Sequence, residues 1–175
     1  MQTNIKIVHL MGPMGAGKGT VAEYLKYKYG FVVFNLSQVV KEVTLEKGMG
    51  INRENMNATY DELKNKFGND VVARRIIEKV KEEQKKVFNG SRDIAEAEYI
   101  KSKFANVLSI YIDADEEIRM KRIMTRQKDI DKGDIKALIK NDNLYALTSK
   151  NVEGIIIVKN NGTIQDLYSS IQTHF

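Results

Sequence analysis

The chain has 175 residues, of which 42% are hydrophobic and 29% charged, a composition typical of a folded globular protein and not of a disordered one. It has no cysteine, which excludes disulfides, thiol nucleophiles and thiolate-held metals. Lys and Arg exceed Asp and Glu by 28 to 23 without forming a dense basic block, which favours small phosphate-bearing partners over nucleic acid.

The organisation of the chain is simple. No apolar run is long enough to span a membrane, and the short apolar stretch near the N-terminus leads directly into a glycine-rich loop, so we expect a cytoplasmic protein without a membrane partner. There is no repeat or linker, and we expect a single domain over residues 1–175. The oligomeric state stays open, with a monomer favoured.

Short apolar, β-branched runs alternate with helical patterns along the whole chain. The runs predict strands at Ile5–Met11, Phe31–Phe34, Lys86–Phe88, Val107–Ile112 and Ile155–Val158. The helical patterns fall at Gly17–Tyr29, Ser37–Lys47, Arg53–Phe67, Asp70–Gln84, Ala95–Phe104, Glu116–Arg126, Asp134–Thr148 and Ile164–Thr173. This alternation predicts an α/β fold, a doubly wound five-stranded parallel sheet with helices on both faces.

A glycine-rich loop between the first strand and the first helix is the strongest signal in the sequence. Small residues let the backbone wrap around phosphate oxygens with its N–H groups pointing inward, and the helix that follows adds further donors. A lysine at its end can reach the β- and γ-phosphates of a nucleotide, and a hydroxyl can ligate Mg²⁺. The expected ATP-binding residues are Gly12, Pro13, Met14, Gly15, Ala16, Gly17, Lys18, Gly19 and Thr20, with Thr20 the candidate Mg²⁺ ligand.

In this loop Gly19 follows Lys18, whereas most phosphate-binding loops have a Ser or Thr directly after the lysine. The segment Gly12–Thr20 resembles the adenylate-kinase branch of the P-loop kinases, in which Gly-Lys-Gly-Thr is the usual variant. Later segments resemble a group of small archaeal and bacterial kinases described as adenylate-kinase-related or dephospho-CoA-kinase-like. These segments are Asn69–Arg74, Phe88–Arg92 with Glu96–Glu98, Ile118–Arg122 followed by Arg126, and Asn160–Leu167.

Three arginines share one face of the helix predicted over Glu116–Arg126, because Arg119, Arg122 and Arg126 are spaced at i, i+3 and i+7. The polar stretch at about 127–133 is short enough to form a lid. The resemblance implies that Arg122 contacts the donor nucleotide and Arg126 the transferring phosphate. The alternative is a solvated basic helix face.

The acceptor is expected between the sheet and the helices at about 37–84. Arg92 follows the third strand at the carboxyl edge of the sheet, where doubly wound folds bind ligands, and the resemblance implies that it holds the acceptor's phosphate. Ser37, Lys41 and Arg74 are the other candidate acceptor contacts, with Lys41 standing where the family carries an arginine. Lys18, Arg92 and Arg126 are the expected catalytic residues.

Two departures from the related kinases concern the acceptor. Asn35 and Ser37 stand where dephospho-CoA kinases carry an acid pair, and Asn89 replaces the acid that usually ends the third strand. A hydroxyl acceptor benefits from a carboxylate that takes its proton, whereas a phosphate acceptor is already an anion. We therefore expect a kinase that uses ATP and Mg²⁺ on a nucleoside or deoxynucleoside monophosphate. A dephospho-CoA kinase and, because of Asn89, a non-catalytic nucleotide-binding regulator stay as alternatives.

Overall fold

A computed structural model of the chain describes residues 5–81, 84–126, 139 and 152–175. The expected lid at about 127–133 lies outside the described residues. The helix expected over Asp134–Thr148 also lies outside them, apart from Ile139, which is helical and buried.

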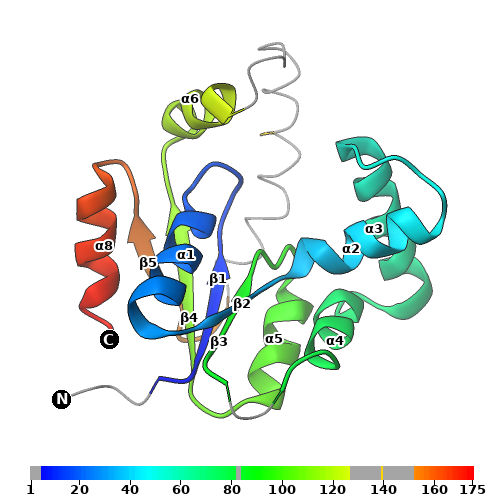
Figure 1. Cartoon of the computed structure of the whole chain (residues 1–175), viewed down its shortest axis with the longest axis horizontal. Helices are drawn as coiled ribbons and strands as arrows, with labels where there is room; N and C mark the ends of the chain where they lie inside the picture. The colour runs from blue at the N-terminus through cyan, green and yellow to red at the C-terminus, as the bar shows by residue number, and fades with distance from the viewer. Residues whose placement is uncertain (1–4, 82–83, 127–138, 140–151) are drawn as a thin grey trace.

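Five parallel strands form one sheet, as the sequence predicted (Figure 1). Along the sheet the order is β2-β3-β1-β4-β5, and every neighbouring pair is parallel. All five strands begin and end within two residues of their predicted bounds. They are β1 (Ile7–Met11), β2 (Val32–Asn35), β3 (Lys86–Asn89), β4 (Val107–Asp113) and β5 (Ile156–Lys159).

Helices cover both faces of the sheet, so the doubly wound α/β class is confirmed (Figure 1). One face packs against α1 (Lys18–Tyr29) and α8 (Ile164–Gln172). The other face packs against α2 (Leu36–Glu46), α3 (Arg53–Phe67), α4 (Val71–Ile77) and α5 (Ile94–Lys103). The helix α6 (Glu116–Arg126) lies beyond the end of β4, near the loop that follows β1 (Figure 1).

The central strand β1 is buried at every position because it has a helical layer on each side. Its residues alternate between the layers, as the pleat of a strand requires. Val8 and Leu10 pack in the core with α1 and α8, whereas Ile7 packs in the core with α2 to α5. As expected for a strand buried on both faces, every residue of β1 except His9 is apolar.

The helix predicted over Asp70–Gln84 is wrong in its second half, because α4 ends at Ile77. After Ile77 the amides of Lys79 and Val80 bond three residues back, to Ile76 and Ile77, so the helix tightens into turns. The apolar stripe of this segment also ends here, and the chain then turns to enter β3 at Lys86.

Among the described residues, no helix combines the length and the apolar character that a membrane crossing requires.

Candidate functional site

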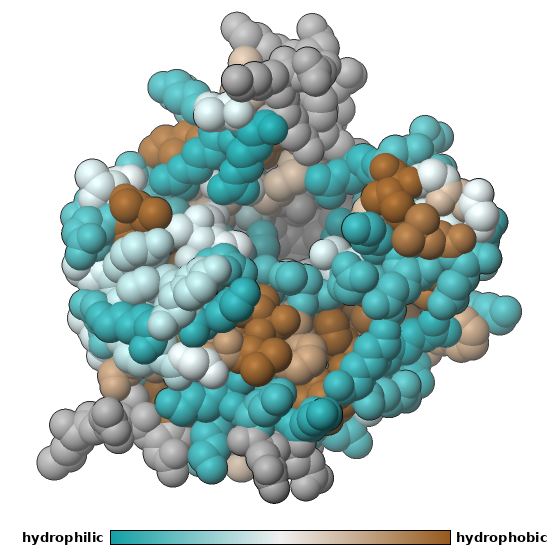
Figure 2. All heavy atoms as spheres, viewed as in Figure 1, coloured by the Kyte–Doolittle hydropathy of each residue, from teal (hydrophilic) through white to brown (hydrophobic). Residues whose placement is uncertain are grey.

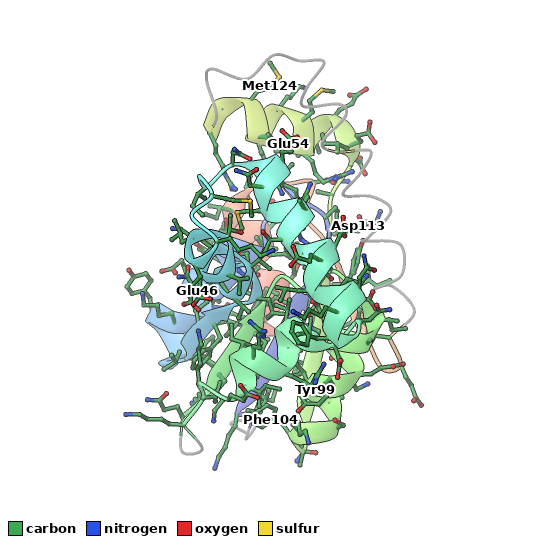
Figure 3. The ribbon with its side chains drawn as sticks, turned by 90° about the vertical axis from the view of Figure 1, so that its right-hand side faces the viewer. Glu46, Glu54, Tyr99, Phe104, Asp113 and Met124 are labelled. Carbon is green, nitrogen blue, oxygen red and sulfur yellow. The ribbon has the colours of Figure 1, made fainter. Side chains whose placement is uncertain are left out.

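A cavity of about 390 Å³ opens at the carboxyl edge of the sheet, beyond the ends of β1 and β3. The chain leaves β1 for α1 on one face and leaves β3 for α5 on the other, and ligands of doubly wound folds bind at such a divide. Figure 2 shows the surface hollowed between α6 and the α2–α3 side of the molecule, and in Figure 3 the end of α3 that carries Glu54 rises toward α6. The cavity is lined by Gly12, Met14, Gly15, Gly17, Lys18, Gly19, Ser37, Arg53, Asn89, Gly90, Ser91, Arg92 and Arg126.

Three glycines of the loop have backbone angles that other residues rarely adopt. The φ angles of Gly12, Gly15 and Gly17 are 128°, 79° and 111°. A Cβ atom on Gly12 would lie 2.0 Å from the carbonyl oxygen of Ile112, and one on Gly17 would lie 2.4 Å from the Asn160 side chain. The loop therefore needs glycine both for its conformation and for its close approach to β4 and to the segment after β5.

Five successive carbonyl groups of the loop accept hydrogen bonds from side chains. Lys18 Nζ donates to Gly12 O at 2.6 Å and to Pro13 O at 2.9 Å. The next three carbonyls belong to Met14, Gly15 and Ala16, and their donors come from elements far away in the sequence. These donors are Arg119 Nη1 at 3.4 Å, Arg122 Nη1 at 3.4 Å and Asn160 Nδ2 at 2.7 Å. These five contacts fix the backbone of the loop where it borders the cavity, and a glycine-rich loop held in this way can bind phosphate through its free N–H groups.

Arg119 and Asn160 thus have roles in the loop's structure that the sequence alone did not predict. Arg119 is only 4% exposed and also donates from Nε to Ala114 O at 3.1 Å, which ties α6 to the end of β4. Asn160 is 6% exposed and follows β5. No local spacing pattern marks either contact, because the partners lie 105 and 144 residues apart in the chain.

Four cationic side chains line the cavity, and one of them was missed by sequence reasoning. Lys18, Arg92 and Arg126 are brought together there as expected. The fourth is Arg53, the first residue of α3, whose Nη2 lies 2.8 Å from the sulfur of Met14 in the loop. No carboxylate is among the described residues that line this cavity.

Arg92 is held from three sides. Its Nη1 donates to Asn57 Oδ1 at 3.1 Å, and its guanidinium lies over the Tyr60 ring at 5.2 Å from the centroid. Its backbone N–H donates to Glu96 Oε2 at 2.7 Å, while Glu96 Oε1 accepts a hydrogen bond from Tyr60. Burial raises the pKa of Glu96 to about 7, against the hydrogen bonds that favour its ionised form. This network fixes the direction of the guanidinium.

A second cavity of about 410 Å³ adjoins the first, since Gly17 and Arg126 line both. Burial lowers the pKa of Arg122, and the positive charge of Arg126 lowers it further, so an anion here would relieve repulsion between the two cations. Thr20, the expected Mg²⁺ ligand, faces this second cavity and not the first. Its lining residues are Gly17, Thr20, Lys121, Arg122, Thr125, Arg126, Asn160, Ile164 and Leu167.

Two expected acceptor contacts do not line either cavity. Lys41 is exposed on α2, because the buried residues of that helix are Leu36, Val39, Val40 and Thr44. Arg74 pairs with Asp70 at 3.1 Å and donates to Phe67 O, which directs it away from the sheet edge. Ser37 does line the first cavity and also a small apolar cavity beside it, of about 10 Å³, between α2, α3, α4 and Arg92.

The two asparagines that replace acids in this sequence are neighbours. Asn35 and Asn89 are register partners at the ends of β2 and β3, and Asn89 Nδ2 donates to Asn35 Oδ1 at 2.7 Å. The other polar atom of the Asn89 amide, Oδ1, is buried and has no hydrogen-bond partner among the described residues. It is an acceptor at the wall of the cavity.

Comparison with known proteins agrees with this geometry. A family model described as "AAA domain" matches residues 8–143. The chain is 28% identical to a UPF0200/UPF0201 protein of Archaeoglobus fulgidus over 98% of its own length and 55% of the relative's, so it spans about half of that protein. It is 30% identical to a UPF0200 protein of Methanococcus maripaludis, over 79% of this chain and 76% of that one. A shikimate kinase from Acinetobacter baumannii shares the fold, with a TM-score of 0.58 at 19% identity, over 98% of this chain and 93% of that one.

The fold and the glycine loop are those of the P-loop kinase superfamily, which confirms the superfamily that the sequence motifs suggested. Within that class the chain belongs to the AAA domain family and is a relative of the UPF0200 proteins.

Replacing Asn160 by Ala tests the support of the loop. The change leaves the buried Ala16 carbonyl without its donor, so we expect a loss of about 1–3 kcal/mol in the free energy of unfolding. Chemical denaturation measures it. The matched control is Asn161→Ala, which removes an exposed hydrogen bond to Asp115 N and should cost less than about 1 kcal/mol. Equal losses in the two variants would contradict a special role for Asn160.

Proposed function

We propose that this protein is an ATP-dependent nucleotide kinase that transfers the γ-phosphoryl group of Mg·ATP to the phosphate of a nucleoside or deoxynucleoside monophosphate. One observation carries the proposal. The first cavity is lined by Lys18, Arg53, Arg92 and Arg126 and, within the described part of the chain, by no acid. Such a cavity suits two phosphate groups brought together. The composition is compatible with a cytoplasmic enzyme of nucleotide metabolism.

The absence of a carboxylate among the described residues that line the first cavity favours a phosphate over a hydroxyl as the attacking group. A phosphate oxygen of the acceptor attacks the γ-phosphorus, the bond from that phosphorus to the β–γ bridging oxygen breaks, and ADP leaves with the electron pair. A dianionic acceptor has no proton to lose in this step. Glu96 lines the small neighbouring cavity, and it already accepts hydrogen bonds from Arg92 N, Asp93 N and Tyr60. It is therefore poorly suited to serve as a base.

The cationic side chains divide between the two substrates. Lys18 belongs to the loop and is suited to the donor's β- and γ-phosphates, with the second cavity taking the rest of the donor. Arg92 stands at the end of β3 with its guanidinium fixed by Asn57 and Tyr60, and is suited to the acceptor's phosphate. Arg126 lines both cavities and can neutralise the group in transit. Arg53 approaches from α3, so it would join the site from the acceptor side.

The residues present fit a Mg²⁺ ion that arrives with ATP better than a preformed metal site. No group of three or more His, Asp or Glu side chains in the described part of the chain could hold a metal on its own. Mg²⁺ commonly keeps several waters and binds through substrate phosphates. The buried and unpartnered Oδ1 of Asn89 can accept a hydrogen bond from such a water, and Thr20 offers a hydroxyl. When bound, Mg²⁺ would neutralise phosphate charge.

The nucleobase of the acceptor would need more room than the structure offers beside Arg92. The apolar cavity beside Arg92 holds only about 10 Å³, which is far too small for a nucleobase. A nucleobase could bind there only if α2 and α3 moved away from β3. Such movements of helices and loops on substrate binding are common in kinases. If these helices do not move, the whole acceptor would have to lie in the first cavity.

Acceptor-dependent ADP formation tests the proposal. The purified protein is incubated with saturating Mg·ATP and a panel of ribo- and deoxyribonucleoside monophosphates, with dephospho-CoA as the hydroxyl acceptor. We expect at least one monophosphate to be turned over much faster than dephospho-CoA. Lys18→Ala is the matched control, with an expected rate loss on the order of 10²–10³.

Two outcomes of this experiment contradict the proposal. A best rate with dephospho-CoA would show that the missing acids do not exclude a hydroxyl acceptor. If no acceptor stimulates the release of ADP, a nucleotide-binding regulator would be the better account. Its structural basis would be the Asn35–Asn89 amide pair, which stands in place of acids.

Arg92→Ala tests the division of substrates. Because Asn57 and Tyr60 hold the guanidinium of Arg92 against α3, on the acceptor side, we expect the KM for the acceptor to rise about tenfold or more, with the KM for ATP changed by less than about threefold. The control is Arg75→Ala, which removes a guanidinium that lies over Phe67 and lines neither the first nor the second cavity of the site. If ATP affinity falls while the acceptor KM stays constant, Arg92 is assigned to the wrong substrate.

A further inference from the structure

A buried histidine lies directly behind the phosphate cavity. His9 is fully buried in the central strand, on the face that packs against α5. Its Nε2 lies 2.5 Å from the hydroxyl oxygen of Ser91, and Ser91 lines the first cavity between Gly90 and Arg92. The amide of Gly90 bonds to Leu10 O at 3.0 Å, so Ser91 is placed beside the start of the glycine loop. This pair links the sheet core to the cavity.

The surroundings of the His9 imidazole favour its neutral form. Burial and, to a smaller extent, the positive charge of Lys101 on α5 lower the pKa of His9 to about 3. A neutral imidazole has one N–H and one lone pair, and the choice between its two nitrogens decides what Ser91 can do.

The surroundings of the second ring nitrogen favour one choice. Nδ1 is buried and has no hydrogen-bond partner among the described residues. A proton on Nδ1 would leave a buried donor unpaired, and orphaned donors are rarer in proteins than orphaned acceptors. A proton on Nε2 instead makes the contact with Ser91 an Nε2–H···Oγ hydrogen bond and leaves only a lone pair at Nδ1.

In that tautomer Ser91 Oγ already accepts a hydrogen bond, so its own proton is free to point into the cavity. Four cations line that cavity, which marks it as a place for phosphate oxygens, and a neutral hydroxyl donor adds a directed hydrogen bond to their charge. We propose that Ser91 donates a hydrogen bond to a phosphate oxygen of the bound nucleotide and that His9 is the positioning residue that fixes Ser91 as a donor. The inference rests on the proposed binding of ATP in this cavity, but not on the identity of the acceptor.

Isothermal titration of Mg·ATP into three variants tests the binding role. We expect Ser91→Ala to weaken ATP binding by about tenfold or more, and Ser91→Thr, which keeps the hydroxyl, to recover most of the loss. The matched control is Ser109→Ala. Ser109 is also a buried serine and is the register partner of His9 on β4, but it does not line the cavity, so ATP affinity should not change. Unaltered ATP binding by Ser91→Ala would overturn the proposal.

A double-mutant cycle tests the positioning role. His9→Gln keeps a side-chain donor near the position of Nε2 and should bind ATP better than His9→Leu. In the Ser91→Ala background the same two changes at His9 should not alter ATP affinity, because His9 acts only through the hydroxyl. Equal further losses in that background would show that His9 serves the fold alone.

The tautomer can be read in the wild-type protein, whether or not the variants fold. The chain has two histidines, so ¹⁵N-labelled histidine gives a simple two-residue spectrum. We expect the ring shifts and couplings of His9 to report an Nε2–H tautomer that stays unchanged from pH 5 to 8. An Nδ1–H tautomer or an imidazolium would overturn the proposal. If no acceptor is phosphorylated while these results hold, the proposed function fails and this inference stands.

Discussion

The hydrogen bonds that hold five successive carbonyl groups of the glycine loop are the constraint on which the site depends. A peptide unit is planar, so a donor that holds the carbonyl of one residue also fixes the N–H of the next, and the donors to Pro13, Met14 and Ala16 thereby fix the amides of Met14, Gly15 and Gly17. Those donors come from α1, from α6 and from the residue after β5. The phosphate-binding surface therefore requires the whole sheet, including its closing strand, to be assembled.

This constraint gives the arginines of α6 different tasks. They share a helix face, yet Arg119 is buried and serves the loop, Arg122 contacts the loop from the wall of the second cavity, and Arg126 reaches both cavities. Sequence spacing predicts the shared face because it depends only on helical periodicity. It could not separate the three roles, since these depend on how far each residue lies from the end of β1.

Local features of the fold were predictable from sequence, and long-range contacts were not. The sheet, the helices and the loop follow from apolar periodicity and from glycine positions, which act over a few residues. The end of α4 was missed because the charged segment after Ile77 has good helix formers, and only the turn into β3 stops the helix. Arg53 and Asn160 were missed as site residues because each reaches the loop from a separate element. Lys41 was carried over by resemblance and Arg74 was chosen because it lies off an apolar stripe, and neither residue lines the two cavities of the site.

The central claim is that a cavity whose described lining has four cations and no acid transfers a phosphoryl group to a phosphate. Phosphorus NMR of the reaction product tests it most directly, because a phosphoanhydride and a phosphate ester of a hydroxyl have distinct shifts and couplings. With Mg·ATP and the preferred acceptor, the account predicts that the transferred phosphorus appears as a terminal phosphoryl group coupled to a second phosphorus. A transferred phosphorus that appears as an uncoupled phosphomonoester would contradict it.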